Sequence, residues 1–355
     1  MRCATAAVVA RLGQRLSTLA NAGQRRDSQR GLAIVADMRP RVSVLDDYQS
    51  VALSSADWSE VEAAYDIDVI TEHLHDAGDL VRRLRDTQVV VAMRERTAFS
   101  ATTLASLPEL RLLVTTGMAN ASIDIPAARA HGITVCGTGG AGNSMPELTF
   151  GMMIALSRHF VEEDRNVRAG RWQETIGPGL SGRTLGIVGL GRLGSRVAVL
   201  AQAFGMAVTA WSPHLTAERA AAVPGVQAVT KEQLFAGSDF VSIHMALTDT
   251  TRDLIGAAEL DLMARHAFLI NTARGPIVNE TALVSALERQ SIAGAALDVY
   301  DIEPLPTDHP LRTMPNTLLL PHIGYVCTEA YQTFYADAVE DIVAFGAGAP
   351  VRELA

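Results

Sequence analysis

Lysine is almost missing from this chain of 355 residues: Lys231 is the only one, and every other basic residue except histidine is arginine. Enzymes that form a Schiff base, and dehydrogenases that use a catalytic lysine, would have to depend on that single residue. It lies in TKEQL at 230–234, which is typical of a helix start, so we expect its role to be solvation. Both enzyme classes are therefore poor candidates.

Cysteine is also scarce, and basic charge is not in excess. Cys3, Cys136 and Cys327 have no metal-like spacing, which argues against a disulfide framework and against a zinc site. A formal net charge of -9 gives no basic surface for nucleic acid or anionic lipid. No apolar run is long enough to span a bilayer. We therefore expect a cytoplasmic protein with small-molecule partners, and no nucleic acid, membrane or metal.

The first 37 residues differ from the rest, being rich in Ala, Arg, Ser and Gln with Asp27 and Asp37 as their only acids. Three interpretations stay open. The segment 1–37 is a disordered extension, or a spurious one that precedes a working start at Met38, or an organelle-targeting peptide, since such peptides are arginine-rich and poor in acids.

From Met38 onward, apolar strand-like runs alternate with helix-like segments. The first runs are RVSVLD (41–46), DIDVIT (66–71), VVVAM (89–93) and RLLVTT (111–116), with helical segments at 55–65 and 80–86. After the glycine cluster at 137–143, further runs are LGIVGLG (185–191), MAVTAW (206–211), DFVSIHM (239–245), AFLINTA (267–273), IAGAALDV (292–299) and TLLLP (317–321). Such alternation predicts parallel, doubly wound sheets.

Two further helices are expected from their sequence patterns. In SMPELTFGMMIALSRH, Ser144 and Glu147 match a capping box with Pro146 in the first turn. Residues 148–156 are almost all apolar or small, so we expect that helix to be buried on every side, at a subunit interface or between domains. The tail after Gly324 predicts an amphipathic helix that crosses back to the first domain.

The string Gly189-Leu-Gly191-Arg-Leu-Gly194 satisfies G-x-G-x-x-G, follows an apolar strand and opens a helix. That context predicts a turn at Gly189, approach of a pyrophosphate at Gly191 and helix packing at Gly194. The next strand should end in Asp or Glu, which would bind ribose hydroxyls, yet Ser212 stands there, followed by Pro213 and His214. NAD and NADP are both admissible. His214 and Arg219 either approach a 2′-phosphate or are solvated.

Three ionisable residues follow strand-like runs near the C-terminal end of the chain: Arg274 in NTARG, Glu303 in VYDIEP and His322 in PHIG. Open α/β sheets bind ligands at strand tips. The planar guanidinium suits a 2-keto carboxylate, and a carboxylate beside an imidazole keeps a proton available for donation. Together, the arginine, the carboxylate and the histidine suit the reduction of a 2-keto acid.

Other charged residues at strand ends have two interpretations each. Asp298 either accepts a hydrogen bond from a nicotinamide carboxamide or caps a turn. Arg94 and Arg96 in MRERT either bind an anion or are solvated loop residues.

In their order, the strings GLGRLG, VSIHMALTDTTRDLI, INTARGPIVNETALVSAL, GAALDVYDIEP and PHIG closely resemble the D-isomer-specific 2-hydroxyacid dehydrogenase family, over roughly 38–348. The resemblance implies an α/β fold with two doubly wound parallel-sheet domains. A Rossmann dinucleotide-binding domain at 144–322 would be inserted into a flavodoxin-like substrate domain at 38–143 and 323–355. It also implies an NAD(P)-dependent enzyme similar to phosphoglycerate dehydrogenases or glyoxylate and hydroxypyruvate reductases.

The resemblance also implies roles for single residues. Arg274 would bind the substrate carboxylate and carbonyl, His322 would donate the proton, and Glu303 would hold and charge the histidine. The residues implied to contact the cofactor are Gly189, Gly191, Arg192, Leu193, Gly194, Ser212, Thr272, Ala273 and Asp298. The family further implies a homodimer joined through the nucleotide domains.

Departures from the family pattern bear on specificity. The family commonly shows Asp where Ser212 stands, and a small residue where Tyr325 follows PHIG. Related formate dehydrogenases carry glutamine where this chain has Glu303, which makes formate oxidation a poor candidate. The alternative function is a dinucleotide-sensing interaction protein, because the family includes transcriptional corepressors that retain the same three residues.

Overall fold

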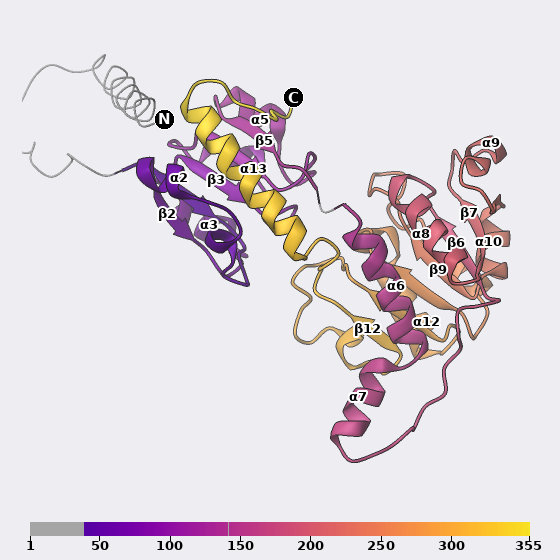
Figure 1. Ribbon diagram of the computed structural model, residues 1–355. Coiled ribbons are helices and arrows are strands. Elements are labelled where there is room, and N and C mark those ends of the chain that lie inside the picture. Colours follow the sequence, from indigo (N-terminus) through magenta and orange to yellow (C-terminus); the bar gives the residue numbers. More distant parts are fainter. Residues whose placement is uncertain (1–38, 141) are drawn as a thin grey trace, which may run out of the picture. The chain divides into compact units, whose positions relative to one another are not determined.

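The computed structural model describes residues 39–140 and 142–355. Residues 1–37 and Met38, which the three interpretations of the N-terminal segment concern, are outside the described residues. The chain divides into two compact units. We name residues 142–326 the central unit, and the described residues 39–140 and 327–355 the N-terminal unit (Figure 1). The units change over at 141/142 and 326/327, whereas the sequence placed these changes at 143/144 and 322/323.

The N-terminal unit is built on a five-stranded parallel sheet of order β2-β1-β3-β4-β5. Its strands are β1 (Arg41–Val44), β2 (Asp66–Val69), β3 (Val89–Ala92), β4 (Leu112–Thr115) and β5 (Thr134–Gly137). This is the flavodoxin-like order. Every residue of β3 and β4 is buried, as expected of central parallel strands covered on both faces.

Short helices and the C-terminal helix cover this sheet. They are η1 (Ala52–Ser54), α2 (Ser59–Ala64), α3 (Ala77–Leu84), α4 (Ala101–Ala105), α5 (Ile125–Ala130) and α13 (Thr328–Gly346). The tail helix expected from the sequence is α13, which packs against β4 and α2 and buries Phe334 and Ile342. Beyond it the chain pairs with β5, where Leu354 N donates to Val135 O at 2.8 Å.

The central unit holds a seven-stranded parallel sheet of order β12-β11-β10-β9-β6-β7-β8. Its strands are β6 (Thr184–Val188), β7 (Ala207–Trp211), β8 (Val226–Ala228), β9 (Phe240–Ile243), β10 (Phe268–Asn271), β11 (Gly294–Leu297) and β12 (Thr317–Leu319). The order reverses between β6 and β9, as in the dinucleotide-binding fold, and a seventh strand extends the sheet. The predicted fold class is thus confirmed.

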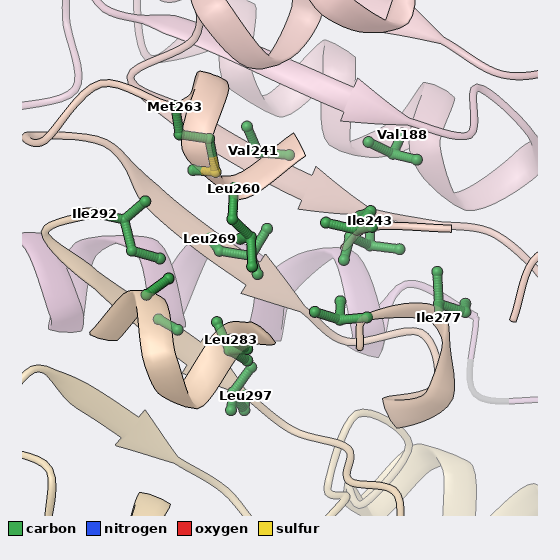
Figure 2. Close-up of a cluster of buried hydrophobic side chains, with 14 of the residues drawn as sticks. Val188, Val241, Ile243, Leu260, Met263, Leu269, Ile277, Leu283, Ile292 and Leu297 are labelled. Atoms are coloured by element: carbon green, nitrogen blue, oxygen red, sulfur yellow. The ribbon is translucent and has the colours of Figure 1, made fainter. Parts of the chain in front are cut away.

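Helices lie on both faces of the central sheet. The helices of this unit are α6 (Ser144–Ser157), α7 (Phe160–Arg168), α8 (Arg192–Ala203), α9 (Ala217–Ala221), α10 (Lys231–Gly237), α11 (Ala257–Leu262), η2 (Gly275–Ile277), α12 (Glu280–Glu288) and η3 (Pro310–Thr313). Of these, α7 packs against α6. On one face, Leu260 of α11 and Leu283 of α12 pack against β9 to β11 (Figure 2). On the other, Met153 of α6 and Val197 of α8 pack against the same sheet. Residues of alternate parity on each strand thus enter two separate cores.

One expectation for α6 is wrong, and another stays a prediction. The capping box is absent, since Asn143 occupies the N-cap without a side-chain bond and the Ser144 hydroxyl donates instead to Gly324 O at 2.9 Å. Burial of the helix on every side, at a subunit interface or between domains, stays a prediction, because part of its apolar surface is open in the single chain. Gly151 is exposed, and Ile154, Ala155 and their neighbour Leu156 are only half-buried. An apolar stripe of α6 therefore reaches the surface of the central unit.

The expectation for Lys231 is also wrong, because its side chain is largely withdrawn from solvent. Its Nζ lies 2.8 Å from Glu259 Oε1, donates to Leu254 O at 2.6 Å and sits 5.5 Å from the centre of the Trp211 ring. The side chain is 22% exposed. The lone lysine thus joins α10, α11 and the end of β7, and its role is structural.

Candidate active site

A glycine turn joins β6 to α8 at the point where the sheet order reverses. Gly189 has a φ of +100°, and a Cβ there would lie 2.6 Å from His244 O. A Cβ on Gly194 would lie 2.1 Å from Gly189 O. A Cβ on Gly191, by contrast, would meet nothing within 4 Å. Two glycines therefore permit the turn, and the third leaves open space before the helix.

The N-terminus of α8 faces that space with its backbone groups available. Gly191 is the N-cap and supplies no side-chain hydrogen bond, and the first turn carries no acidic residue. Arg192 and Leu193 begin the helix, the first exposed and the second half-buried. Free N–H groups and the positive end of the helix dipole favour an anion at this position. The cradle fits the pyrophosphate of a dinucleotide.

His244, which the sequence interpretation did not single out, adds a polar group beside this turn. It follows β9, its Nε2 lies 2.9 Å from Ser242 Oγ, and its carbonyl oxygen faces Gly189. Burial lowers its pKa to about 4, so the ring is neutral at neutral pH. Within the described residues its buried Nδ1 has no hydrogen-bond partner. Such an orphaned atom is what a site for a polar ligand would show.

The end of β7, where a carboxylate would bind ribose hydroxyls, carries Ser212 instead. Ser212 is half-buried, and His214 after it is exposed. The guanidinium of Arg219, from α9, donates to His214 O at 2.9 Å. A cation is therefore held in the loop that follows β7, and no acid stands at the strand end.

The turn after β10 is held by Asn271, a second residue that the sequence interpretation left without a role. Asn271 Oδ1 accepts from Ala273 N at 3.0 Å, and its Nδ2 donates to Arg274 O at 3.0 Å. Thr272 Oγ1 lies 3.1 Å from Thr149 Oγ1 of α6. In the sequence, the position of Asn271 at the start of NTARG is the signal that could have indicated this role. Asn271 thus fixes the backbone that presents Arg274.

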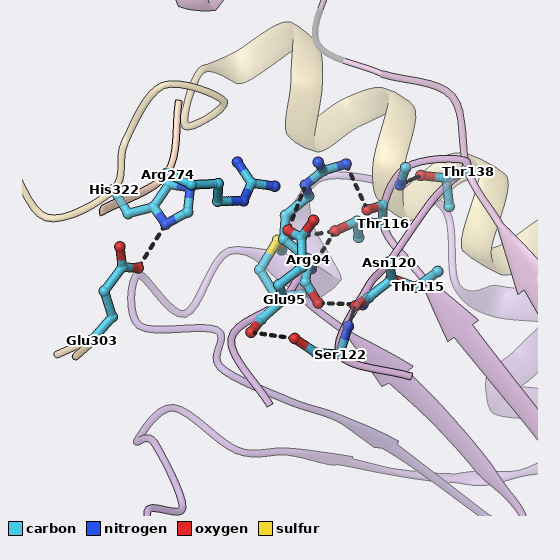
Figure 3. Close-up of polar contacts among 12 residues, drawn as sticks. Arg94, Glu95, Thr115, Thr116, Asn120, Ser122, Thr138, Arg274, Glu303 and His322 are labelled. Carbon is cyan, nitrogen blue, oxygen red and sulfur yellow. Dashed lines mark hydrogen bonds and ion pairs between the residues drawn. The ribbon is translucent and has the colours of Figure 1, made fainter. Parts of the chain in front are cut away.

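Glu303 and His322 lie in direct contact (Figure 3). Glu303 Oε2 is 2.6 Å from His322 Nδ1, and Glu303 Oε1 accepts from Tyr300 N at 3.0 Å. The imidazole side chain is 17% exposed and the carboxylate side chain 32%. The structure therefore brings together the two residues that the sequence paired, and it orients the imidazole through Nδ1.

Asp298 holds the backbone next to His322. Its Oδ1 accepts from Ile323 N at 2.7 Å and its Oδ2 from Gly324 N at 2.8 Å. These bonds support His322 in a left-handed conformation with a φ of +54°, which is unfavourable outside glycine. Burial raises the pKa of Asp298 to about 6, against the lowering effect of the two amides and of His322. The turn-cap interpretation is what the contacts show, and contact with a carboxamide stays a prediction.

The three candidate catalytic residues follow three adjacent strands. Arg274 comes after β10, Glu303 after β11 and His322 after β12, and these strands pair in register and in parallel. The carboxyl ends of all three therefore lie along one edge of the sheet, which is also the edge of the glycine turn after β6, with β9 between β10 and β6. This is the edge at which open α/β sheets bind ligands.

Two arginines follow β3 in the N-terminal unit. Arg94 donates through Nη1 to Thr116 O at 3.1 Å (Figure 3). Arg96 donates to Asp46 O at 2.9 Å, and its guanidinium lies 4.5 Å from the centre of the Tyr48 ring. Both are anchored in this unit rather than extended into solvent, and anion binding by either stays a prediction.

Residues 39–140 and 142–355 contain no group of three or more His, Cys, Asp or Glu side chains that is placed to hold a metal ion. In the same residues, no helix combines the length and the apolar content that a bilayer crossing requires.

Comparison with known proteins places this geometry in context. A family model described as "D-isomer specific 2-hydroxyacid dehydrogenase, NAD binding domain" matches residues 150–324. A glyoxylate reductase of Thermofilum pendens is 36% identical over 273 residues, which are 75% of this chain and 80% of that protein. A D-3-phosphoglycerate dehydrogenase of Bacillus subtilis is 35% identical over 288 residues, 80% of this chain but 54% of that protein.

Solved structures agree with the sequence matches. A phosphoglycerate oxidoreductase from Vibrio cholerae superposes with a TM-score of 0.83 at 34% identity, and the match covers 88% of this chain and all of that one. A putative D-3-phosphoglycerate dehydrogenase from Ralstonia solanacearum also gives a TM-score of 0.83, at 32% identity. With two parallel-sheet units, a glycine cradle and matches of this extent, the chain belongs to the D-isomer-specific 2-hydroxyacid dehydrogenase family.

Proposed function

We propose that this protein is an NAD(P)-dependent D-2-hydroxyacid dehydrogenase that reduces a 2-keto acid, with Arg274, Glu303 and His322 as its catalytic residues. The observation that carries the proposal is the 2.6 Å contact between Glu303 Oε2 and His322 Nδ1. That contact engages one imidazole nitrogen and leaves the other, Nε2, to meet a substrate oxygen. Family membership supports hydride transfer as the reaction.

Each residue then has a distinct task. A nicotinamide cofactor held at the glycine turn would supply the hydride for the substrate carbonyl carbon. His322 donates a proton from Nε2 to the carbonyl oxygen, and the negative charge of Glu303 stabilises the imidazolium before it donates. Arg274 binds the substrate carboxylate with its planar fork and stabilises the charge that develops on the carbonyl oxygen.

Asn271 and Asp298 hold the loops that carry this chemistry. Asn271 fixes the turn of Arg274 by two hydrogen bonds, and Asp298 fixes the two residues after His322. Because proton and hydride transfer depend on placement within a fraction of an ångström, fixed loops reduce the reorganisation needed at the moment of reaction.

For the cofactor, we propose that the α8 N-terminus binds the pyrophosphate and that the chain accepts NADPH as well as NADH. Ser212 leaves no carboxylate to repel a 2′-phosphate. The Arg219 guanidinium, held on the His214 carbonyl, supplies a cation in the loop after β7. The relatives' names leave the substrate at the level of a small 2-keto acid.

We also propose a homodimer that is joined through the central unit. Large apolar side chains are exposed along α7 and the segment after it: Phe160 at 54%, Val161 at 44%, Val167 at 52%, Trp172 at 73% and Ile176 at 100%. Soluble monomers rarely expose so many large apolar side chains within one segment. Together with the half-buried stripe of α6, they suit a self-complementary interface with a second copy.

One experiment tests the proposed function: a panel of glyoxylate, hydroxypyruvate and bulkier 2-keto acids, each assayed with NADH and with NADPH. Oxidation of the reduced cofactor by at least one acid is the expected result. Nucleotide binding without turnover across the whole panel would contradict it and would favour the sensor alternative, which none of the named relatives supports.

A further inference from the structure

The loop that carries His322 fixes a second ring beside the imidazole. Asp298 accepts from the amides of Ile323 and Gly324, at 2.7 Å and 2.8 Å. Val326 N donates to Ile323 O at 2.8 Å, which closes a turn around Tyr325. The Ser144 hydroxyl of α6 donates to Gly324 O at 2.9 Å. Hydrogen bonds thus hold the backbone before and after Tyr325, which fixes the position from which its side chain extends.

From that point the Tyr325 ring packs against the imidazole of His322. The ring centres are 5.5 Å apart and the planes meet at 67°, the edge-to-face arrangement that aromatic pairs prefer. Tyr325 is half-buried, and its phenol oxygen is buried. The imidazole therefore contacts both the Glu303 carboxylate, at Nδ1, and the aromatic ring of Tyr325.

We propose that Tyr325 is a positioning residue for the proton transfer: its ring keeps the His322 imidazole on Glu303, with Nε2 directed at the substrate. The inference rests on the proposed function, because it deepens the role given to His322. A single hydrogen bond leaves the imidazole free to turn about its side-chain torsions, and a packed aromatic ring removes that freedom.

Two variants separate the ring from the hydroxyl. Tyr325→Leu removes the ring but keeps apolar bulk, and Tyr325→Phe keeps the ring. Phe204→Leu is the control, because Phe204 also makes a ring contact, with Phe150 at 5.2 Å, at the far end of α8. For Tyr325→Leu we expect kcat to fall roughly threefold to tenfold while KM changes less than about twofold. Tyr325→Phe and Phe204→Leu should behave like the parent protein.

A second measurement reads the position of the imidazole directly. In the ligand-free protein, the proton on Nδ1 should give a downfield NMR resonance because it is bonded to a carboxylate, and its loss in Glu303→Gln assigns it. This resonance should broaden in Tyr325→Leu and stay sharp in Tyr325→Phe. The alkaline limb of the kcat profile should also move to lower pH in the leucine variant alone.

The outcomes are distinguishable from failure of the proposed function. If the parent protein turns over none of the keto acids, the proposed function is wrong, and the NMR comparison still tests the position of the imidazole. A leucine variant with unchanged kcat and an unchanged resonance overturns the inference. So does a phenylalanine variant that loses as much as the leucine variant, because the hydroxyl would then be the group that matters.

Discussion

At the scale of single residues, the two carboxylate oxygens of Glu303 have different partners, a backbone amide and the imidazole of His322. Oε1 accepts from Tyr300 N at 3.0 Å and Oε2 contacts His322 Nδ1 at 2.6 Å. The carboxylate is thereby fixed before it acts on its partner. Its charge and its position can therefore be separated by substitution, because glutamine keeps the shape and loses the charge.

Glu303→Gln should move the alkaline limb of the reduction profile to lower pH, because an imidazolium without a carboxylate partner loses its proton sooner. The measurement is kcat against pH between about 5 and 9, a range that spans the usual histidine titration. Glu280→Gln is the matched control, since Glu280 Oε1 contacts His309 Nε2 at 2.9 Å outside the site. An unchanged profile in Glu303→Gln would count against the proposed pair.

Arg274→Lys should keep the positive charge and lose the planar fork. Since a lysine cannot bind a carboxylate and a carbonyl oxygen at once, we expect kcat/KM for the keto acid to fall on the order of a hundredfold or more, with NADH binding unchanged. Steady-state kinetics and NADH fluorescence measure the two effects. Arg289→Lys, at an exposed ion pair with Asp261, is the control. Equal kcat/KM in Arg274→Lys and its control would refute the role of Arg274.

At the scale of elements, apolar runs predicted strands well where both faces of a strand are buried. Every residue of β9, β10 and β11 is buried, and apart from Ser242 and Asn271 these strands consist of apolar residues and glycine. The sequence interpretation missed β8, which has three residues and is not buried, and β5, which runs into the glycine cluster. A short edge strand is specified by its neighbour more than by its own residues.

The residues of the candidate site likewise include some that the sequence predicted and some that it did not. Sequence order alone paired Glu303 with His322 because each follows a strand, and parallel strands end at one edge. It gave no role to Asn271 or His244, because their tasks arise from a backbone turn and from a buried nitrogen without a partner. The capping box failed for a similar reason, since the Ser144 hydroxyl serves a loop 180 residues away in sequence.

The helix α13 carries a pH-dependent element. Asp341 is fully buried, its Oδ1 lies 3.1 Å from Arg352 Nη2, and burial raises its pKa to about 7. The nearby acids Asp337 and Glu340 share the same arginine. Because the native pKa exceeds the unfolded value, the native state binds the extra proton. Its stability therefore falls as pH rises from about 4 to about 7.

Asp341→Asn should flatten that dependence, because the amide has no proton to lose. The full shift corresponds to a change on the order of 4 kcal/mol across this range. Hydrogen exchange of the α13 amides at several pH values measures the local free energy of opening. Parallel pH curves for the variant and the parent protein would show that another group titrates.

At the scale of the whole molecule, association with a second copy is the property most open to test. Trp172→Ser combined with Ile176→Ser removes two of the most exposed apolar side chains, at 73% and 100% exposure. Sedimentation should show the parent protein as a dimer and the variant shifted toward monomer, since the apolar core of an interface carries most of its energy. Tyr48→Ser, an exposed aromatic residue of the N-terminal unit, is the control. A monomeric parent protein would exclude the dimer.

Residues 352–354 cover the edge strand β5 of the N-terminal unit. Gly137 N donates to Arg352 O at 3.0 Å and Leu354 N to Val135 O at 2.8 Å, while Cys136 and Glu353 form an antiparallel bridge. The residues after α13 thereby pair with the outer edge of β5. The main-chain donors and acceptors of this edge strand are then not available to pair with other polypeptides. Clipping that tail would uncover a template for intermolecular strand addition, so shortened forms should precipitate at concentrations that the intact protein tolerates.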